Sequence, residues 1–434
     1  MSDFEKIILK DKKISIWGIG YLGYTTILRL QENGFLSTLY DFSKSRLSDL
    51  QKGLYPAKEQ INSWSKNGKI PSLELEKIEI AEDKNLLFDN KIHIISFPNT
   101  KSSSYVSLAE TFVKNRNKLE NSLVIFQSAG VPEDIEKFFY VILKKHNINI
   151  KIATVFRSDW TIEDFFDKTS IRVISGNNQN AVNDVKVFLD FLGLEAIKLN
   201  SIVEAEIYEN AKNALNYTVV AFFNQLSLAY PGINVNELSK KMFKDLKFDN
   251  NITLGVSGVD YKSEQSIENI LRGSTKDFLT ILKEANRTNI SFLFYYIDLL
   301  KSKNIKSVTI LGLSSYSTMK DLRFSPSVIL SEYLYRENIE IYIHDENFNK
   351  EEILDVLPYC NFIDIYNDRI LSDTVIIMSL CREYKFLTQD DIDKMDLSNV
   401  KYVLDNTGFF KNFIYSKRTI YHQLCDGNLS KVIY

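Results

Sequence analysis

The sequence predicts an α/β protein built from two largely parallel sheets, one at each end of the chain, with long helices between them. A short apolar strand at residues 14–17 runs directly into a glycine-rich turn, and a second apolar strand at 308–311 again meets a glycine, Gly312. Between these halves, apolar positions recur at helical spacing over two long stretches. A chain of 434 residues exceeds what one hydrophobic core usually supports, so several domains are expected.

The N-terminal part has the pattern of a βαβ unit that opens a doubly wound sheet. The first strand leads through the glycine turn into an amphipathic helix that ends near Asn33, and a second strand ends at Asp41. Further apolar strands, at 92–97, 123–126 and 171–174, alternate with helical stretches. We expect an N-terminal domain over residues 1–200.

The rest of the chain predicts a helical middle and a second α/β domain. Residues 201–228 and 276–300 form the two long helical stretches, and the polar segment 250–269 is expected to be an irregular loop between them. We expect a central helical domain over 201–302, which offers a homodimer interface, and a Rossmann-like domain over 303–434. The later strands of that domain are expected at 339–343, 374–378 and 402–404.

Composition excludes several classes of partner. The formal net charge is −3, from 53 basic and 56 acidic residues, so nucleic acid and anionic membranes are not expected as partners. No run approaches the roughly 18 apolar residues of a membrane span, and Met1 to Lys13 lacks the pattern of a signal peptide. The three cysteines and four histidines have no metal-ligand spacing. We expect a soluble, cytoplasmic protein without a metal site, acting on a small-molecule substrate.

The glycine turn predicts a dinucleotide site. It reads Gly18-Ile19-Gly20-Tyr21-Leu22-Gly23, lies between a strand and a helix, and is followed 18 positions later by Asp41 at the end of the next strand. Gly18 permits the tight turn, Gly20 lets the backbone approach a diphosphate, and Gly23 allows close packing, while the helix N-terminus with Tyr21 and Leu22 offers amides to the phosphates. Asp41 can accept hydrogen bonds from the ribose hydroxyls, which favours NAD over NADP.

In this context the chain resembles the UDP-glucose/GDP-mannose dehydrogenase family over nearly its whole length. Besides the glycine turn, the resemblance rests on three segments: Ala205-Glu206 with Asn213, Phe222 to Leu226, and Gly312 to Ser327 with its Asp-Leu-Arg-Phe-Ser-Pro run. The resemblance implies an N-terminal Rossmann domain, a central dimerisation domain and a C-terminal Rossmann-like domain. It also implies oxidation of a nucleotide-linked sugar to a uronate with two NAD per turnover.

The thiol that this family uses as nucleophile has no counterpart at its expected position. The family carries it in Gly-Gly-Ser-Cys-x-Pro-Lys-Asp, and the best match here, residues 271–277, has Gly273 in its place. Ser274 would reach the position only after a shift of one residue, and no cysteine occurs between Met1 and Tyr359. An unactivated hydroxyl is a poorer nucleophile than a thiolate at neutral pH.

Other substrate-side positions of the family are also replaced. A lysine that holds the substrate in the family corresponds to Glu209, and two loop glutamates correspond to Thr154 and Ser158. Two further family motifs, a Phe-Lys pair and a late Asp-x-Arg, correspond to Ser315-Tyr316 and Asp405-Asn406-Thr407.

The cofactor side is retained. By resemblance, Asn213 and Asp277 are the candidate catalytic residues beside the reacting carbon. The candidate cofactor-binding residues outside the glycine turn and Asp41 are Pro98, Ser128, Lys276 and Arg323.

Three functions are compatible with this pattern. The first is an NAD-dependent oxidoreductase that performs a two-electron oxidation on a nucleotide-activated sugar or a related metabolite, without a covalent thiol intermediate. The second is a family relative that has lost catalysis and has a binding or regulatory role. The third is an ordinary nucleotide-sugar 6-dehydrogenase with an unrecognised nucleophile. The intact glycine turn favours the first function.

Overall fold

The computed structural model describes residues 12–428 except 66, 98–101, 158, 160, 167–170, 247–253, 256–260, 275–278, 315–319, 321 and 382. The chain divides into two compact units. The first comprises the residues up to Ala211 and a short segment beginning at Asn269, and the second comprises the remainder. The three-part division at residues 200 and 302 stays a prediction. No helix in the described part of the chain is long and apolar enough to cross a membrane.

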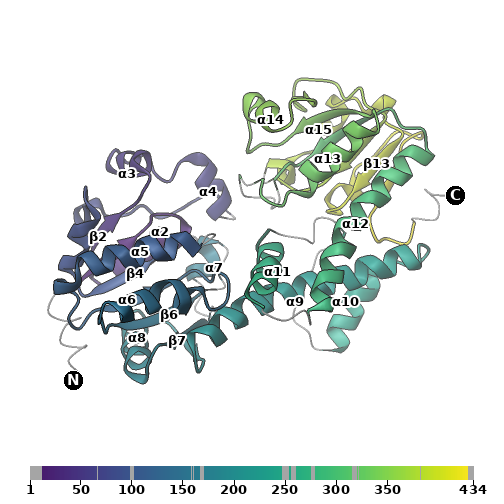
Figure 1. Cartoon of the computed structure of the whole chain (residues 1–434). Helices are drawn as coiled ribbons and strands as arrows, with labels where there is room; N and C mark the ends of the chain where they lie inside the picture. The colour runs from purple at the N-terminus through teal and green to yellow at the C-terminus, as the bar shows by residue number, and fades with distance from the viewer. Residues whose placement is uncertain are drawn as a thin grey trace. The chain divides into compact units, whose positions relative to one another are not determined.

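The first unit is built on an eight-stranded sheet of order β3-β2-β1-β4-β5-β6-β7-β8, shown with its covering helices in Figure 1. Its strands are β1 (Lys13–Trp17), β2 (Leu36–Tyr40), β3 (Ile78–Ile80), β4 (Ile92–Ile95), β5 (Leu123–Phe126), β6 (Lys151–Phe156), β7 (Arg172–Gly176) and β8 (Ala196–Lys198). Its helices are α2 (Tyr21–Glu32), α3 (Lys44–Gln51), α4 (Lys58–Trp64), α5 (Ser102–Lys114), η4 (Ile135–Tyr140), α6 (Val141–Lys145), α7 (Ile162–Phe166) and α8 (Gln179–Phe191). The predicted doubly wound order is confirmed.

One pair of strands departs from the predicted parallel arrangement. β7 pairs antiparallel to β6, with Thr154 opposite Ser175, while β8 returns parallel to β7. The apolar pattern of a buried strand is the same in both directions, so the sequence could not distinguish them.

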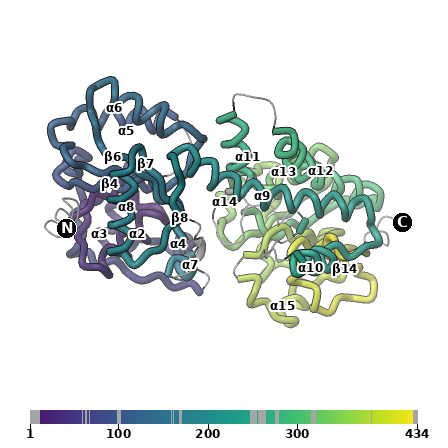
Figure 2. The backbone as a smooth tube through the Cα atoms, turned by 90° about the horizontal axis from the view of Figure 1, so that it is seen from below, coloured from purple at the N-terminus to yellow at the C-terminus, as the bar shows by residue number. Residues whose placement is uncertain are grey.

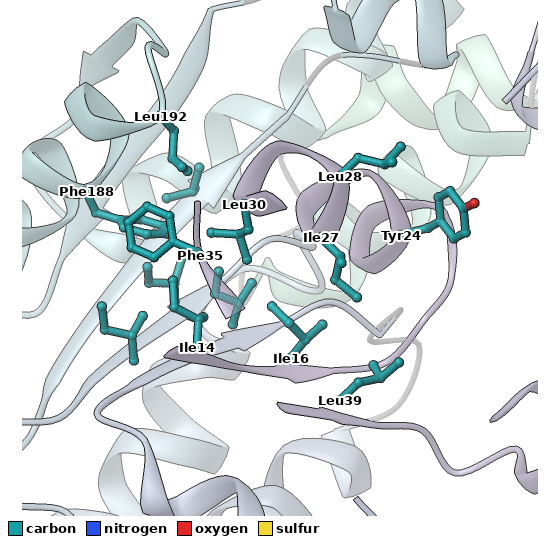
Figure 3. Close-up of a cluster of buried hydrophobic side chains, with 14 of the residues drawn as sticks. Ile14, Ile16, Tyr24, Ile27, Leu28, Leu30, Phe35, Leu39, Phe188 and Leu192 are labelled. Carbon is teal, nitrogen blue, oxygen red and sulfur yellow. The ribbon is translucent and has the colours of Figure 1, made fainter. Parts of the chain in front are cut away.

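The core of this unit forms where α2 packs on the sheet. Figure 3 shows Ile27 and Leu30 of α2 lying over Ile14 and Ile16 of β1, and all four side chains are buried. These helix positions are three residues apart, and the strand positions two apart, which are the spacings that put side chains on one face. This packing fixes the start of α2 at the carboxyl end of β1.

The central helices belong largely to the second unit. They are α9 (Ile202–Ala229), α10 (Val235–Asp245), α11 (Tyr261–Gly273) and α12 (Thr280–Ser302), and α9 runs uninterrupted over 28 residues (Figure 2). The helical predictions for 201–228 and 276–300 are confirmed in outline.

The expectation of an irregular loop over 250–269 is wrong for its last part, because α11 begins at Tyr261. The buried face of α11 is mostly polar, so the helical spacing was hidden from hydrophobicity alone. Asn269 donates to the side-chain oxygen of Asn210 (3.1 Å), and Asn213 donates to Ser266 (3.2 Å). These hydrogen bonds to α9 satisfy polar groups that the sequence suggested were solvated.

The second unit ends in a six-stranded parallel sheet of order β11-β10-β9-β12-β13-β14. Its strands are β9 (Ser307–Leu311), β10 (Glu340–His344), β11 (Asn361–Phe362), β12 (Thr374–Ile377), β13 (Tyr402–Asp405) and β14 (Ile420–Gln423), and its helices are α13 (Pro326–Arg336), α14 (Lys350–Val356) and α15 (Gln389–Lys394). This is the strand order of the first six strands of the N-terminal sheet, so the predicted second Rossmann-like fold is confirmed.

Candidate dinucleotide site

The three glycines of the turn have different surroundings. Gly18 has a φ angle of +100°, a backbone conformation that residues with a side chain rarely adopt. A Cβ atom on Gly23 would lie 2.0 Å from the carbonyl oxygen of Gly18, so only glycine allows the helix to start this close to the strand. A Cβ atom on Gly20 would meet no atom within 4 Å. The backbone therefore leaves open space at Gly20, where a diphosphate would approach.

The first turn of α2 offers backbone donors beside that space. Gly20 is the N-cap residue, and none of the described side chains caps this helix end. Uncapped amides and the helix dipole make such a terminus suited to an anion. The turn thus fits the diphosphate of a dinucleotide.

Asp41 lies directly after β2 and is held by the turn. Its Oδ2 accepts from the Ile19 amide (2.8 Å) and its Oδ1 accepts from the Ser43 amide (2.7 Å). Each carboxylate oxygen has a second lone pair, so these bonds orient Asp41 without using up its capacity to accept from ribose hydroxyls. The side chain is held at the carboxyl edge of the sheet, where the sequence placed it.

An aromatic surface adjoins Asp41 that the sequence did not single out. Phe42 is 65% exposed, and its ring contacts those of Tyr40 and Phe97 at centroid separations of 5.6 and 6.1 Å. Such an exposed aromatic side chain beside Asp41 offers a flat apolar surface of the kind on which a base could stack. The signal was present in the sequence as an aromatic residue directly after the acidic one.

Tyr21 and Leu22 are tied to the segment that follows β6. The Tyr21 hydroxyl donates to Asp159 (2.9 Å), and Arg157 donates to the Leu22 carbonyl (3.2 Å) and to Asp159 (3.0 Å). Burial and then the Asp159 charge raise the pKa of Tyr21, which keeps its hydroxyl protonated and donating. Burial alone would raise the pKa of Asp159, but Arg157 and Arg172 outweigh it and hold that pKa at about 2.

The remaining predicted site residues fall into three groups. Ser128 follows β5 at the carboxyl edge of the first sheet and is partly buried. In the second unit, Asn213 is partly buried on α9 and Arg323 is exposed shortly before α13. Pro98, Lys276 and Asp277 lie outside the described residues.

Position 273, where the family has its thiol, is closely packed. A Cβ atom on Gly273 would lie 3.1–3.3 Å from atoms of Pro132, which is tighter than ordinary van der Waals contact. Both residues belong to the first unit. A side chain at this position would therefore require Pro132 to shift by a few tenths of an ångström.

Two other positions that replace family residues serve the fold. Thr154 lies inside β6, is fully buried and shares a hydrogen bond with Ser175 (2.7 Å). Asn406 accepts from the Tyr296 hydroxyl (2.6 Å) and donates to the Ile377 carbonyl (2.8 Å). Ser158, Ser315 and Tyr316 lie outside the described residues.

Glu206, part of the resemblance on α9, is fully buried against the loop after β5. Its Oε2 accepts from the Glu133 amide (2.9 Å), and its Oε1 has no hydrogen-bond partner in the described structure. Burial, opposed in part by that amide, raises the pKa of Glu206 to about 8. This carboxyl group is therefore largely protonated at neutral pH.

The second glycine turn repeats the hydrogen bonds of the first but is filled. Asp345, directly after β10, accepts from the amides of Leu313 (2.6 Å) and Asn347 (2.8 Å), as Asp41 does from Ile19 and Ser43. However, Asp345 is 1% exposed.

Gly312, the glycine of this second turn, is closely packed. A Cβ atom on Gly312 would lie 2.4 Å from atoms of Ser379, and the hydroxyls of Ser325 and Ser327 donate to the carbonyls of Leu313 and Gly312. The counterpart of Gly20 in this turn is Ser314, which is 1% exposed and whose hydroxyl donates to Asp345 (3.2 Å). Of the two turns as described, the N-terminal one therefore has the open space for a diphosphate.

The two sheets of matching strand order, each with a glycine turn and an acid after its second strand, define a two-sheet protein of the Rossmann-like α/β class. No family model matches the chain. It is 21% identical over 355 residues to the UDP-glucose 6-dehydrogenase of Bacillus subtilis, a match that covers 76% of this chain and 79% of the relative. It is 21% identical over 420 residues to the UDP-N-acetyl-D-mannosamine dehydrogenase of Methanococcus vannielii, covering 94% and 95%.

Solved structures agree in fold. The UDP-D-ManNAc dehydrogenase of Pyrococcus horikoshii aligns with TM-score 0.75 and 18% identity over 96% of this chain and all of that one. The UDP-glucose dehydrogenase of Pyrobaculum islandicum aligns with TM-score 0.73 and 19% identity over 95% and 97%. The chain is thus similar along most of its length to nucleotide-sugar dehydrogenases and shares their fold.

Proposed function

We propose that this protein is an NAD-dependent dehydrogenase that oxidises a hydroxyl of a nucleotide-activated sugar, or of a related metabolite, to a carbonyl group in a single two-electron step. One observation carries the proposal: the dinucleotide turn is open at Gly20, whereas position 273, which would need a thiol for a four-electron oxidation, is packed against Pro132. The names of the relatives support a nucleotide sugar as the substrate class.

NAD is the cofactor that the described residues fit. The open turn at Gly20 and the uncapped start of α2 would hold its diphosphate, Asp41 its adenosine ribose and Phe42 its adenine. Pro98, Ser128, Lys276 and Arg323 are proposed as further contacts from the resemblance. When bound, NAD supplies the hydride acceptor.

For the substrate, Asp277 and Asn213 are the proposed catalytic residues. A carboxylate can take the hydroxyl proton as the carbonyl forms, directly or through a water, and an amide can orient the oxygen. Asn213 already donates to Ser266 on α11, which fixes its orientation on α9. A nucleophile is not needed in this reaction, because no acyl intermediate has to be hydrolysed.

A homodimer is proposed through the central helices. On α9, Ile207, Leu215 and Phe222 are 47%, 51% and 50% exposed, and they recur at spacings of eight and seven residues along one face of the helix. An exposed apolar stripe of this kind is typical of an interface. Sedimentation of the purified protein at several concentrations tests the assembly state.

The proposed function is tested by incubating the protein with NAD and a panel of UDP- and GDP-sugars. We expect NADH formation with at least one sugar and a carbonyl product, identified by mass and by trapping with hydroxylamine. NAD binding without turnover of any sugar would instead support the binding or regulatory role. A carboxylate product would support an ordinary 6-dehydrogenase.

A further inference from the structure

The strongest unassigned feature is a buried ionic cluster beneath the cofactor turn. Arg157 and Asp159 follow β6, and their side chains are 2% and 0% exposed. Arg172 of β7, also buried, lies 3.4 Å from Asp159. Buried charges are costly unless they are paired and fully hydrogen-bonded, so a cluster in the core calls for an explanation.

The cluster contacts the first five residues of α2, Tyr21 to Thr25, at several points. The Arg157 guanidinium donates to the Leu22 carbonyl (3.2 Å) and to the Thr25 hydroxyl (2.8 Å). Asp159 accepts from the Tyr21 hydroxyl (2.9 Å), and the guanidinium carbon of Arg157 lies 5.6 Å from the centre of the Tyr21 ring. Three residues of one helical turn are thus held by one ion pair.

The same network continues to the carboxyl ends of two other strands. Arg157 donates to Thr26 (3.3 Å), Gln127 after β5 donates to Thr26 (2.9 Å), and Ser96 after β4 donates to Gln127 (2.8 Å). All of these side chains are buried. The start of α2 is therefore fixed to the ends of β4, β5 and β6 by polar groups with directional requirements, beyond the apolar packing of its other residues.

We propose that the Arg157–Asp159 pair is a positioning device for the cofactor: it fixes the amides at the start of α2 in the arrangement that binds a diphosphate. This inference rests on the proposed NAD site. Binding by backbone amides depends on their placement to a fraction of an ångström, and supporting residues that lock that placement raise affinity without touching the ligand. Asp41 and Phe42, the proposed contacts of the adenosine end, make no hydrogen bond to Arg157 or Asp159 in the described structure, so we expect the pair to act on diphosphate binding.

The test compares Asp159→Asn and Tyr21→Phe with a matched control, Asp184→Asn. Asp184 pairs with Lys151 in the same unit, away from the glycine turn. NAD affinity is measured by titration calorimetry, and adenosine affinity by displacement of NAD. Tyr21→Phe removes only one hydroxyl, so it keeps the proposal testable if Asp159→Asn does not fold.

We expect Asp159→Asn to weaken NAD binding about tenfold or more and Tyr21→Phe about threefold, with adenosine affinity unchanged. Asp184→Asn should change neither. The double variant, with both Asp159→Asn and Tyr21→Phe, should lose less NAD-binding free energy than the two single variants lose together, because the two side chains share one hydrogen bond.

Equal weakening of NAD and adenosine, or equal effects of Asp159→Asn and Asp184→Asn, would show a general loosening and overturn the proposal. So would unchanged NAD affinity in Tyr21→Phe and Asp159→Asn. A wild-type protein that binds no NAD would contradict the proposed function and, with it, the cofactor role of the pair.

Discussion

Gly20 and Gly23 lie in one turn, yet a side chain would meet different surroundings at the two positions. Open space lies beyond Gly20, whereas the carbonyl oxygen of Gly18 lies directly beyond Gly23. The sequence motif specifies both as glycine without distinguishing why. The structure separates a glycine beside open space from a glycine that close packing requires.

Gly20→Ala should therefore fold normally and bind NAD poorly. Its φ of −68° suits alanine, so the free energy of unfolding should change by less than about 0.5 kcal/mol. The added methyl group occupies the diphosphate space and should raise the NAD dissociation constant about tenfold or more. Thermal unfolding and calorimetric titration check the two effects separately.

The matched variant Gly23→Ala should do the reverse. The methyl group meets backbone at 2.0 Å, and we expect a loss of about 3 kcal/mol or more of unfolding free energy. If both variants lose stability equally, the space at Gly20 is not open as described.

Phe42 gives a second test at the residue scale. If its exposed ring supports adenine, Phe42→Ala should cost about 1–2 kcal/mol of NAD binding, roughly a tenfold rise in dissociation constant. Phe386, 71% exposed in the second unit, provides the control, since Phe386→Ala should leave NAD binding unchanged. Equal NAD affinity in wild type and Phe42→Ala would remove this residue from the site.

At the scale of elements, apolar periodicity in the sequence predicted the helices and strands whose buried faces are apolar. It did not predict a helix whose buried side chains are mostly polar. The strand–turn–helix start was predicted because Ile14 and Ile16 alternate and Ile27 and Leu30 keep helical spacing. The start of α11 was missed because its buried face consists largely of polar residues that pair with α9. The direction of β7 was missed because burial, which the pattern reports, does not depend on strand direction.

The same limit applied to the site. Asp41 was predicted from its position after a strand, and the structure holds it at the turn. Arg157 and Asp159 carry no local pattern, because their partners Tyr21 and Thr25 are more than 130 positions away in the sequence. Contacts between residues so far apart in the sequence can be identified only once the fold is known.

The close packing of Gly273, at the end of α11, against Pro132 predicts the effect of introducing a thiol at this position. Gly273→Cys restores the family's residue type but must displace Pro132, so the free energy of unfolding should fall by about 1–3 kcal/mol. We expect no carboxylate product from this variant by mass spectrometry. Ser274→Cys, at the neighbouring exposed position, should be close to neutral for stability. Carboxylate formation by Gly273→Cys at full stability would mean that the site accommodates a thiol.

The contact between α9 and the loop after β5 predicts a pH dependence. The pKa of Glu206 is about 8 in the folded protein, mainly through burial, and lies near 4.3 when unfolded. Between these values the folded state binds more protons, so this group's contribution to stability is lost as pH rises from about 5 to 8. Glu206→Gln should remove that part of the decline.

Melting temperatures of the wild type and Glu206→Gln, measured at intervals over this range, check the prediction. The difference between the two curves isolates Glu206 from other titrating groups, including His344, whose pKa burial lowers to about 4. Parallel curves would mean that Glu206 is charged in the folded protein.

At the scale of the whole molecule, two sheets that share the order of six strands carry two glycine turns with the same hydrogen bonds, and within the described residues the N-terminal turn is the one with room for a ligand phosphate. Asp41 and Asp345 accept from equivalent amides, but a Cβ atom on Gly20 would meet open space, whereas its counterpart Ser314 is a buried serine. We therefore expect one NAD per chain, a stoichiometry that the calorimetric titration gives directly.

A dehydrogenase that stops after two electrons forms one NADH for each nucleotide sugar consumed, so the decisive measurement is the ratio of NADH formed to nucleotide sugar consumed. The ratio is followed by NADH absorbance and by mass spectrometry of the sugar in the same reaction. We expect one NADH per sugar and a carbonyl product. Two NADH per sugar and a carboxylate product would contradict it.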